Sequence, residues 1–177
     1  MHPLEKFRYC PACGSPRFND SSEKSRRCAD CGFEFFLNPS AAVAAFIVNE
    51  RDQLLVVVRA KEPARGTLDL PGGFTDMHET VGEAVAREVK EETGLTVGKS
   101  EFLFSIPNTY VYSDFRIPTM DMFFRCTVAD CSSVTPDDDA AEARWIPISE
   151  LNPADFGLQS ISQAVARFVE MSYVDFF

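Results

Sequence analysis

The stretch from Gly73 to Leu95 reads GFTDMHETVGEAVAREVKEETGL and decides the fold around it. Thr80-x-x-Glu83 is a capping-box pattern, which predicts a helix that begins near Val81. Gly94 suits the position just after the last helical residue, where the backbone commonly turns left-handed. The stretch therefore predicts one helix, bounded by Thr80 and Gly94.

The predicted helix combines an apolar stripe with acidic residues. Counted from residue 81, the core-facing positions i, i+3, i+4, i+7 and i+11 hold Val81, Ala84, Val85, Glu88 and Glu92. The first turns thus present apolar groups, and the last turns present two carboxylates on the same side. Glu91 borders this pair, whereas Glu83 and Lys90 fall on the far side, where solvated charges are expected.

Two carboxylates on an inward-leaning face need a partner. They repel each other, and the loss of water raises their free energy further. A divalent cation removes both costs, and hard oxygen ligands suit Mg²⁺ or Mn²⁺, which bridge protein carboxylates to substrate phosphates. Taken alone, Glu88 and Glu92 at i and i+4 would favour an ordinary solvated surface helix, so the surrounding pattern has to decide.

The whole stretch resembles the Nudix box, G-x5-E-x7-R-E-U-x-E-E-x-G-U, in which U is an aliphatic residue, and all nine defined positions match. The resemblance implies hydrolysis of a nucleoside diphosphate linked to another group, with Mg²⁺ or Mn²⁺ held by Glu88, Glu91 and Glu92. It further implies that Arg87 orients these carboxylates through a salt bridge and that Glu79 supports the metal network. Arg87, Glu91 and Glu79 are therefore the catalytic residues that we predict within the box.

The segment before the box fits the same site. Leu70-Pro71-Gly72-Gly73-Phe74 occupies the place where many members of the resembled family carry an LPGG segment. Glycine lets the backbone approach a metal or a phosphate closely. In that family the carbonyl at the position of Gly72 is often a metal ligand, so Gly72 joins the predicted metal site. Without the box, the Gly-Gly pair would be only a turn signal.

A further carboxylate is expected on a loop after the box, because many Nudix enzymes place one there as a general base or a metal ligand. The acids ahead of Arg144-Trp145-Ile146 are Asp137, Asp138, Asp139 and Glu142. Glu142 and Asp139 lie nearest the strand expected there, and Glu142 is the first candidate. The alternative is a solvated acidic loop. In that case Glu79 or Glu91 acts as the base, or the bound metal alone generates the hydroxide.

The N-terminal cysteines form a second pattern. Cys10-Pro11-Ala12-Cys13-Gly14 is echoed by Cys28-Ala29-Asp30-Cys31-Gly32, and two such C-x2-C knuckles are typical of a zinc ribbon. Four thiolates complete a tetrahedron around Zn²⁺, so the site predicted at Cys10, Cys13, Cys28 and Cys31 is structural. Disulfides or free thiols are the alternatives. The first six residues lack the apolar run of a signal peptide, and a reducing cytosol favours zinc.

The chain divides into two predicted parts, a zinc ribbon at residues 1–36 and a Nudix hydrolase domain at residues 40–177. Strands are predicted at residues 41–48, 53–59, 67–70, 101–105, 108–112, 119–128 and 143–146, and a closing amphipathic helix at residues 158–170. Strands around two helices indicate an α/β (α+β) fold in which a mixed sheet lies between helices. The Nudix resemblance implies the same α/β/α sandwich.

A zinc ribbon followed by a Nudix domain resembles the NADH pyrophosphatase group. That group carries an S-Q-P-W-P-F-P-type array downstream of the box, whereas this chain reads Ser105-Ile106-Pro107-Asn108-Thr109-Tyr110 in the comparable place. The Ser and a Pro remain, but the Gln and the Trp-Pro-Phe core do not, so NADH specificity does not follow. Tyr110 and Tyr112 alternate on a predicted strand and share one face. They could stack on a substrate base or simply pack against the protein.

Composition sets limits on partners and location. The 177 residues include 27 acidic and 17 basic side chains, a net charge of −10. No apolar stretch approaches the roughly 20 residues that span a membrane. An acidic chain is repelled by nucleic acid. The expected partner is therefore a nucleotide-type small molecule in the cytoplasm, without membrane or nucleic acid, and a homodimer is left open.

These observations predict a metal-dependent pyrophosphohydrolase acting on NADH, ADP-ribose or a related dinucleotide-type substrate, with catalytic Mg²⁺ or Mn²⁺ and structural Zn²⁺. The alternative is a non-catalytic module that senses nucleotides, or that binds RNA or protein through the ribbon. Lys24-Ser25-Arg26-Arg27 is a small basic cluster in the ribbon, and a solvated hairpin tip explains it equally well. The intact box favours the enzyme, because Nudix domains that only sense ligands usually have damaged boxes.

Overall fold

The structure is a computed structural model that describes residues 2–112, 114–132, 134–135 and 140–174. The chain folds into two compact units: residues 1–40 together with 109–118, and residues 41–108 together with 119–177. Three of the acids predicted as base candidates, Asp137, Asp138 and Asp139, lie outside the described residues.

The smaller unit contains a ribbon of three short antiparallel strands. These are β1 (Phe18–Ser22), β2 (Ser25–Cys28) and β3 (Glu34–Phe36), in the order β1-β2-β3, preceded by the 3₁₀ helix η1 (Pro3–Lys6). The buried cluster here consists of Cys10, Phe18 and Cys28, with Phe7 and Phe35 packed against it. A core of this size calls for a cross-link such as a metal site, because a module this short buries little apolar surface.

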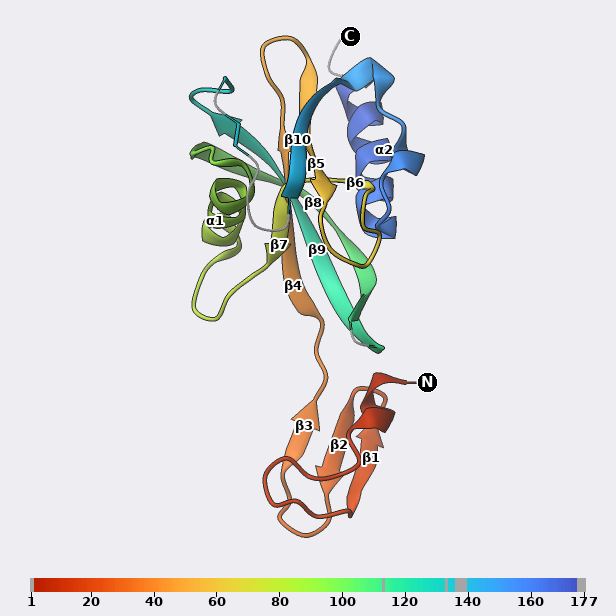
Figure 1. The fold of residues 1–177 in the computed structure, drawn as a ribbon. Coiled ribbons are helices and arrows are strands. Elements are labelled where there is room, and N and C mark those ends of the chain that lie inside the picture. The colour runs from red at the N-terminus through yellow and green to blue at the C-terminus, as the bar shows by residue number, and fades with distance from the viewer. Residues whose placement is uncertain (1, 113, 133, 136–139, 175–177) are drawn as a thin grey trace. The chain divides into compact units, whose positions relative to one another are not determined.

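The larger unit contains two sheets, with a helix on either side (Figure 1). One sheet has the order β10-β5-β6, from β10 (Ala140–Pro147), β5 (Gln53–Arg59) and β6 (Leu68–Asp69). The other has the order β7-β4-β9-β8, from β7 (Gly72–Phe74), β4 (Ser40–Ile47), β9 (Phe115–Val128) and β8 (Val97–Tyr112), of which residues 109–118 belong to the smaller unit. The helices are α1 (Val81–Thr93) and α2 (Gln159–Val174), and the short helices η2 (Ile148–Glu150) and η3 (Pro153–Asp155) precede α2.

Strand β4 shows how the layers are held together. Ala44 and Phe46 face a core that includes residues of α2, and the Phe46 ring stacks on Phe168 of that helix with 4.1 Å between ring centroids. Ala45 and Ile47 alternate with them and face a second core that includes residues of α1. Because successive side chains of a strand point to opposite faces, a continuous apolar run is what a strand buried on both faces requires.

The predicted α+β class is confirmed, with α1 and α2 as its two outer layers, and the strands of the expected mixed sheet fall into two hydrogen-bonded sheets. The helix predicted between Thr80 and Gly94 is α1, and the strand predicted at residues 53–59 is β5. No helix in the described part of the chain is long and apolar enough to cross a membrane.

Two details of the predicted strands were wrong. Residues 101–105 and 108–112 form one strand, β8, rather than two, although Pro107 lies between them. Strand β8 lies at the edge of its sheet, where a proline without an N–H group is tolerated. Strand β7 was not predicted, because Gly72-Gly73 reads as a turn, yet it pairs antiparallel with β4.

Candidate functional site

Helix α1 forms where the local sequence predicts it. The side chain of Thr80 accepts a hydrogen bond from the backbone N–H of Glu83, and the Glu83 carboxylate accepts one from the N–H of Thr80 at 2.7 Å. At the other end Gly94 has φ 73°, a left-handed conformation that glycine adopts without steric cost. These two caps fix the helical phase and therefore the side on which each glutamate emerges.

The side of α1 toward the sheet carries both apolar residues and carboxylates. Its buried residues are Ala84, Val85, Val89, Glu92 and Thr93. Glu88 is partly buried, with 13% of its side chain exposed, whereas Glu91 is 46% exposed. The predicted placement is therefore confirmed for Glu88 and Glu92, which turn inward, and for Glu91 at their border. Glu83 and Lys90 are exposed, as predicted.

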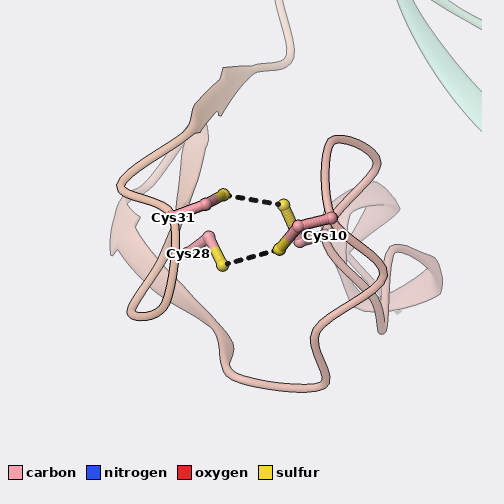
Figure 2. A group of neighbouring side chains, drawn as sticks. Cys10, Cys28 and Cys31 are labelled. Atoms are coloured by element: carbon pink, nitrogen blue, oxygen red, sulfur yellow. Dashed lines mark hydrogen bonds between the residues drawn. The ribbon is translucent and has the colours of Figure 1, made fainter.

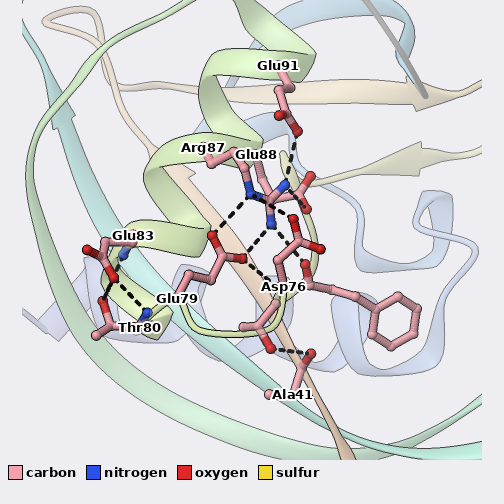
Figure 3. Close-up of polar contacts among 10 residues, drawn as sticks. Ala41, Asp76, Glu79, Thr80, Glu83, Arg87, Glu88 and Glu91 are labelled. Atoms are coloured by element: carbon pink, nitrogen blue, oxygen red, sulfur yellow. Dashed lines mark hydrogen bonds and ion pairs between the residues drawn. The ribbon is translucent and has the colours of Figure 1, made fainter.

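Arg87 joins the acidic residues into one network (Figure 3). Its guanidinium donates two hydrogen bonds to the Glu79 carboxylate, at 2.7 and 3.1 Å, so this pair is bidentate. The Nη1 atom donates to Glu88 at 2.8 Å and to Glu91 at 3.0 Å, and Nη2 also donates to the carbonyl of Phe74 at 3.1 Å. The planar donor fork of arginine suits this role, which the single ammonium of lysine would not fill.

Glu79 is fixed from two sides. Besides Arg87, its carboxylate accepts a hydrogen bond from the backbone N–H of Asp76 at 2.6 Å. The bonds from Arg87 and from that N–H hold the pKa of Glu79 below its ordinary value. Glu79 is therefore an anchored anion that orients Arg87, and through Arg87 it orients Glu88 and Glu91.

Glu88 lies directly against the backbone of β7. A Cβ atom added to Gly73 would lie only 2.6 to 2.8 Å from the carboxyl atoms of Glu88, so only glycine leaves room for this carboxylate. Burial raises the pKa of Glu88, and the charges of Glu91 and Glu79 add to the rise while Arg87 opposes it. The carboxylate thus sits where the protein alone does not fully offset its charge.

Glu92 is buried, with 7% of its surface exposed, and its carboxylate accepts a hydrogen bond from the N–H of Gly72 at 3.0 Å. Gly72 has no room for a side chain either, since a Cβ there would lie 2.1 Å from the carbonyl oxygen of Val43 in β4. The two glycines of β7 therefore allow the strand to fit closely between β4 and the carboxylates of α1.

The register of β7 shows which way the Gly72 carbonyl points. The carbonyl of Pro71 and the N–H of Thr75 bond to β4, to Ala45 and Ala41 respectively. In an antiparallel strand, alternate residues direct their backbone groups to opposite sides. The N–H of Gly72 and the carbonyl of Phe74 accordingly face α1, at Glu92 and Arg87. The carbonyl of Gly72 is turned to the same side, which fits its prediction as a metal ligand.

This donor set suits a hard divalent cation. Glu79, Glu88, Glu91 and Glu92 bring four carboxylates to one side of α1 against the single guanidinium of Arg87, with the backbone of Gly72 alongside. Carboxylate and carbonyl oxygens are the ligands that Mg²⁺ and Mn²⁺ prefer. The raised pKa of Glu88 fits the same conclusion, because added positive charge would favour its ionised form.

The four cysteines of the ribbon converge. The sulfur atoms of Cys10 and Cys31 lie 3.6 Å apart and those of Cys13 and Cys28 lie 3.7 Å apart (Figure 2). Each knuckle is closed by a hydrogen bond from a glycine N–H, Gly14 to the carbonyl of Cys10 and Gly32 to that of Cys28, and both glycines have positive φ.

The sulfur arrangement is compatible with zinc. All four Sγ atoms lie within 4.8 Å of one another, and none of the cysteines is in a disulfide. Zn–S bonds of about 2.3 Å at tetrahedral angles place sulfur atoms about 3.8 Å apart, close to the two distances found. A backbone hydrogen bond from Cys31 is the main cause that lowers the pKa of Cys28 to about 7. Within the described residues, this is the one group of three or more His, Cys, Asp or Glu side chains whose ligand atoms all lie within 4.8 Å of one another, so the glutamates of α1 are spread more widely than these four cysteines.

Comparison with known proteins shows to which family this chain belongs. The sequence model of the NUDIX domain matches residues 38–168, which is most of the chain. This chain belongs to the NUDIX domain family. The crystal structure of a NUDIX hydrolase from Nitrosomonas europaea superimposes with a TM-score of 0.71, covering 92% of this chain and 90% of that one at 24% identity, and so shows the shared fold.

Curated NUDIX relatives include two named activities. The NAD-capped RNA hydrolase NudC of Deinococcus radiodurans is 28% identical over 148 residues, which cover 81% of this chain and 50% of that protein. The ADP-ribose pyrophosphatase of Methanocaldococcus jannaschii is 32% identical over 138 residues, which cover 77% of this chain and 78% of that protein. The chain thus spans about half the length of the NudC relative.

The remaining predicted residues are Glu142 on β10 and Tyr110 and Tyr112 on β8. Glu142 is exposed on β10, where its carboxylate forms two 2.7 Å hydrogen bonds with Arg144, and this pairing lowers its pKa. Tyr110 is partly buried and Tyr112 is 64% exposed. Neither the described hydrogen bonds nor the described ring contacts bring Glu142, Tyr110 or Tyr112 to Arg87, so their roles stay predictions.

Sequence reasoning missed two backbone contributors to the NUDIX site. The carbonyl of Phe74 and the N–H of Asp76 hold Arg87 and Glu79. A backbone carbonyl or N–H does not depend on the residue type, so no sequence motif could have identified these two groups. The segment between Gly73 and Glu79 could nevertheless have been suspected, because the box fixes its length at five residues, and a fixed length indicates a defined loop conformation.

Proposed function

We propose that this chain is a metal-dependent pyrophosphohydrolase that cleaves a nucleoside diphosphate joined to another group, such as NADH, ADP-ribose or a related dinucleotide-type compound. The observation that carries the proposal is the pair of inward carboxylates, Glu88 and Glu92, held against the two glycines of β7. Glu92 gains a hydrogen bond from Gly72 there, but burial raises the pKa of Glu88, so the protein alone does not fully favour both charges. The names of the relatives, an NAD-capped RNA hydrolase and an ADP-ribose pyrophosphatase, support the substrate class.

Each residue of the network has a proposed task. Glu88, Glu92 and Glu91, with the carbonyl of Gly72, would hold Mg²⁺ or Mn²⁺. The ion would supply positive charge to the diphosphate in the transition state and lower the pKa of an attacking water. Arg87 and the anchored Glu79 keep the carboxylates oriented before substrate arrives, so little reorganisation is needed during the reaction.

The general base is proposed among a small set of acids. Glu142 stays a candidate, although it would have to leave Arg144 to accept a proton. Asp139 is the second candidate. If neither contributes, Glu91 is the most exposed acid of the box network and is the best placed to meet solvent water. Tyr110 and Tyr112 are proposed as a stacking surface for a base, and Zn²⁺ at the four cysteines as a purely structural ion.

A substrate panel tests the proposal. The zinc-loaded full chain would be assayed with NADH, NAD⁺, ADP-ribose and nucleoside triphosphates, each with Mg²⁺ or Mn²⁺. Glu92→Gln should lower kcat on the best substrate by about 10²-fold or more, because it removes one metal-binding charge. The fold should persist, since an amide oxygen can still accept the hydrogen bond from Gly72.

Glu83→Gln is the matched control. Glu83 lies on the same helix, its neutral analogue still completes a capping box, and its side chain makes no contact with Arg87. This variant should keep parental activity. Metal-dependent turnover that is equal in the parent and in Glu92→Gln would contradict the metal assignment. Binding of a dinucleotide without turnover by the parent would support the nucleotide-sensing alternative instead. Localisation of a tagged chain would test the cytoplasmic assignment, and sedimentation would test for a homodimer.

A further inference from the structure

The smaller unit contains a cleft of about 400 Å³ that the proposed reaction does not use. Its polar lining comes from His2, Glu23, Lys24, Thr109 and Arg116. All of its lining residues belong to residues 1–40 and 109–118, so the cleft lies within one compact unit. Its volume falls in the range of small-molecule binding sites.

The cations of this cleft are not used by the protein itself. Within the described residues, the side chains of Lys24 and Arg116 take part in no hydrogen bond or ion pair. Two other basic residues of the unit are paired, Arg26 with Asp20 at 2.6 Å and Arg17 with Asp30. Glu23 is the single carboxylate against these two cations in the lining. The cleft therefore presents unneutralised positive charge to a ligand.

The unit that contains this cleft is much less acidic than the rest of the chain. Residues 1–40 and 109–118 hold seven Lys and Arg against six Asp and Glu, whereas the larger unit holds ten against twenty-one. An anion would be repelled by most of this protein in the absence of a metal. The smaller unit is the part of the chain where an anionic ligand meets little net repulsion.

The wall segments are held in place by contacts within the unit. The backbone N–H of Leu37 donates to the carbonyl of Lys24 at 2.8 Å, which joins two lining segments. The rings of Phe7 and Phe115 meet edge to face, with centroids 5.8 Å apart, directly beside Arg116. Arg26 also donates to the carbonyl of Phe7. A cleft with such fixed walls binds a ligand at a lower entropic cost than a mobile surface does.

The rest of the lining is apolar. Pro3, Leu37, Pro39 and Pro118 contribute to it, and the three prolines have no backbone N–H to offer. Apolar walls favour contact with a ring or a sugar rather than with a solvated inorganic ion. A lining that combines positive charge with apolar surface suits a ligand that carries both a phosphate and a ring.

We propose that this cleft binds a nucleotide, with its phosphate on Lys24 and Arg116 and its ring or sugar against the proline-rich wall. The site is separate from the carboxylate network of α1 and contains no metal-binding carboxylate pair. It would therefore bind nucleotide without Mg²⁺ or Mn²⁺. The inference goes beyond the proposed hydrolysis and does not depend on it.

Binding is tested by titrating ¹⁵N-labelled, zinc-loaded protein with AMP, adenosine and inorganic phosphate, with no divalent cation added apart from the bound zinc. AMP should shift the amide signals of Lys24, Leu37 and Arg116 in a saturable manner. Adenosine and inorganic phosphate should each bind at least about tenfold more weakly, because each lacks one of the two kinds of contact. Higher salt should weaken the binding of AMP.

Two variants and one control make the test specific. Lys24→Gln and Arg116→Gln should each weaken AMP binding by about tenfold, since each removes a hydrogen bond to a charged phosphate. Arg27→Gln removes the same charge from an exposed position outside the cleft and should leave the affinity unchanged. Equal weakening by all three variants would mean that AMP responds only to net charge, and the proposal would be wrong.

Other outcomes are equally decisive. If AMP shifted only the amide signals of Gly72 and Gly73, it would bind at the carboxylate network, and the proposed binding to the cleft would be wrong. Equal affinities for AMP and adenosine would show that the phosphate contributes nothing to binding, which would also refute the proposal. A protein without hydrolase activity that still shows AMP shifts at Lys24 and Arg116 would support the cleft and refute only the proposed function.

Discussion

Substitution of Gly73 by alanine isolates the role of Glu88, because the added methyl group meets the carboxylate directly. The new Cβ atom would lie 2.6 Å from one carboxylate oxygen, 2.7 Å from the carboxyl carbon and 2.8 Å from the other oxygen. Ordinary contact begins at 3.4 Å, so the carboxylate must move by about 0.8 Å. The atoms displaced are the end of a side chain rather than backbone, and the fold can yield there.

The expected result is a large loss of activity with a small loss of stability. A misplacement of about 1 Å in a catalytic group can cost about 10²-fold in rate, so kcat should fall by about that factor. The displaced carboxylate weakens its 2.8 Å ion pair with Arg87, a partly exposed contact worth at most about 1 kcal/mol. For a chain of this size that loss lowers Tm by only about 2–4 °C.

Two further glycine variants serve as controls. Gly82→Ala lies in the first turn of α1, where the nearest atoms are 3.8 and 4.0 Å from the added Cβ, so it should keep parental activity and gain slightly in stability. Gly72→Ala would place its Cβ 2.1 Å from the carbonyl oxygen of Val43, which is backbone and cannot turn aside. That variant should lose stability severely rather than activity alone.

The assay is kcat on the best substrate of the panel at saturating Mg²⁺, together with a thermal melt of each variant. If Gly73→Ala keeps its kcat within about threefold of the parent while remaining folded, then a displacement of Glu88 does not matter and its assignment as a metal ligand is refuted. If the Tm of Gly73→Ala were as low as that of Gly72→Ala, strand β7 itself would have moved, and not only the Glu88 carboxylate.

The remaining predictions concern zinc, Arg87, acid stability and the base. Metal analysis should give about one zinc per chain, and Cys13→Ser should lose it and lower Tm, whereas two disulfides and no zinc would refute the site. Arg87→Lys should lower kcat by at least about tenfold, because an ammonium cannot hold three carboxylates in the same fork. Glu79 has a folded pKa below its unfolded value of 4.5, so its contribution to stability is present above that value and is lost as pH falls through the folded pKa. The Tm difference between the parent and Glu79→Gln should therefore shrink between about pH 6 and about pH 3, and a constant difference would contradict the pairing. Single alanine substitutions at Asp139 and Glu142 should show one loss of about 10²–10⁴-fold in rate if either residue is the base, and parental rates in both would move that role into the box or to the metal alone.

Local sequence predicted the helix of the site well because its determinants are local. Thr80, Glu83 and Gly94 act within a few residues of themselves, and each cap forms as predicted. The inward placement of Glu88 and Glu92 follows from the same helical phase. Such features depend on spacing along one element, which a sequence displays directly.

Features that depend on pairing between distant segments were harder to predict. Taken alone, Gly72 and Gly73 would be only a turn signal, yet they form strand β7, where Val43 on one side and Glu88 on the other leave no room for a side chain. Residues 101–105 and 108–112 were predicted as two strands, but β8 continues through Pro107 at the edge of the sheet. Edge position and close approach are tertiary facts, and periodicity along the chain does not encode them.

The same tertiary packing explains why Arg87 has so many acidic partners. Strand β7 brings its backbone against α1, so that Glu88 and Glu92 are largely withdrawn from solvent, with 13% of the Glu88 side chain and 7% of Glu92 exposed. Glu79 and Glu91 then add negative charge around the one guanidinium, which must serve three carboxylates at 2.7 to 3.0 Å. Since one positive charge cannot neutralise four negative ones, the protein alone leaves this site short of positive charge. This shortage is the reason why we propose that Mg²⁺ or Mn²⁺ binds here, since added positive charge would favour the ionised form of the carboxylates.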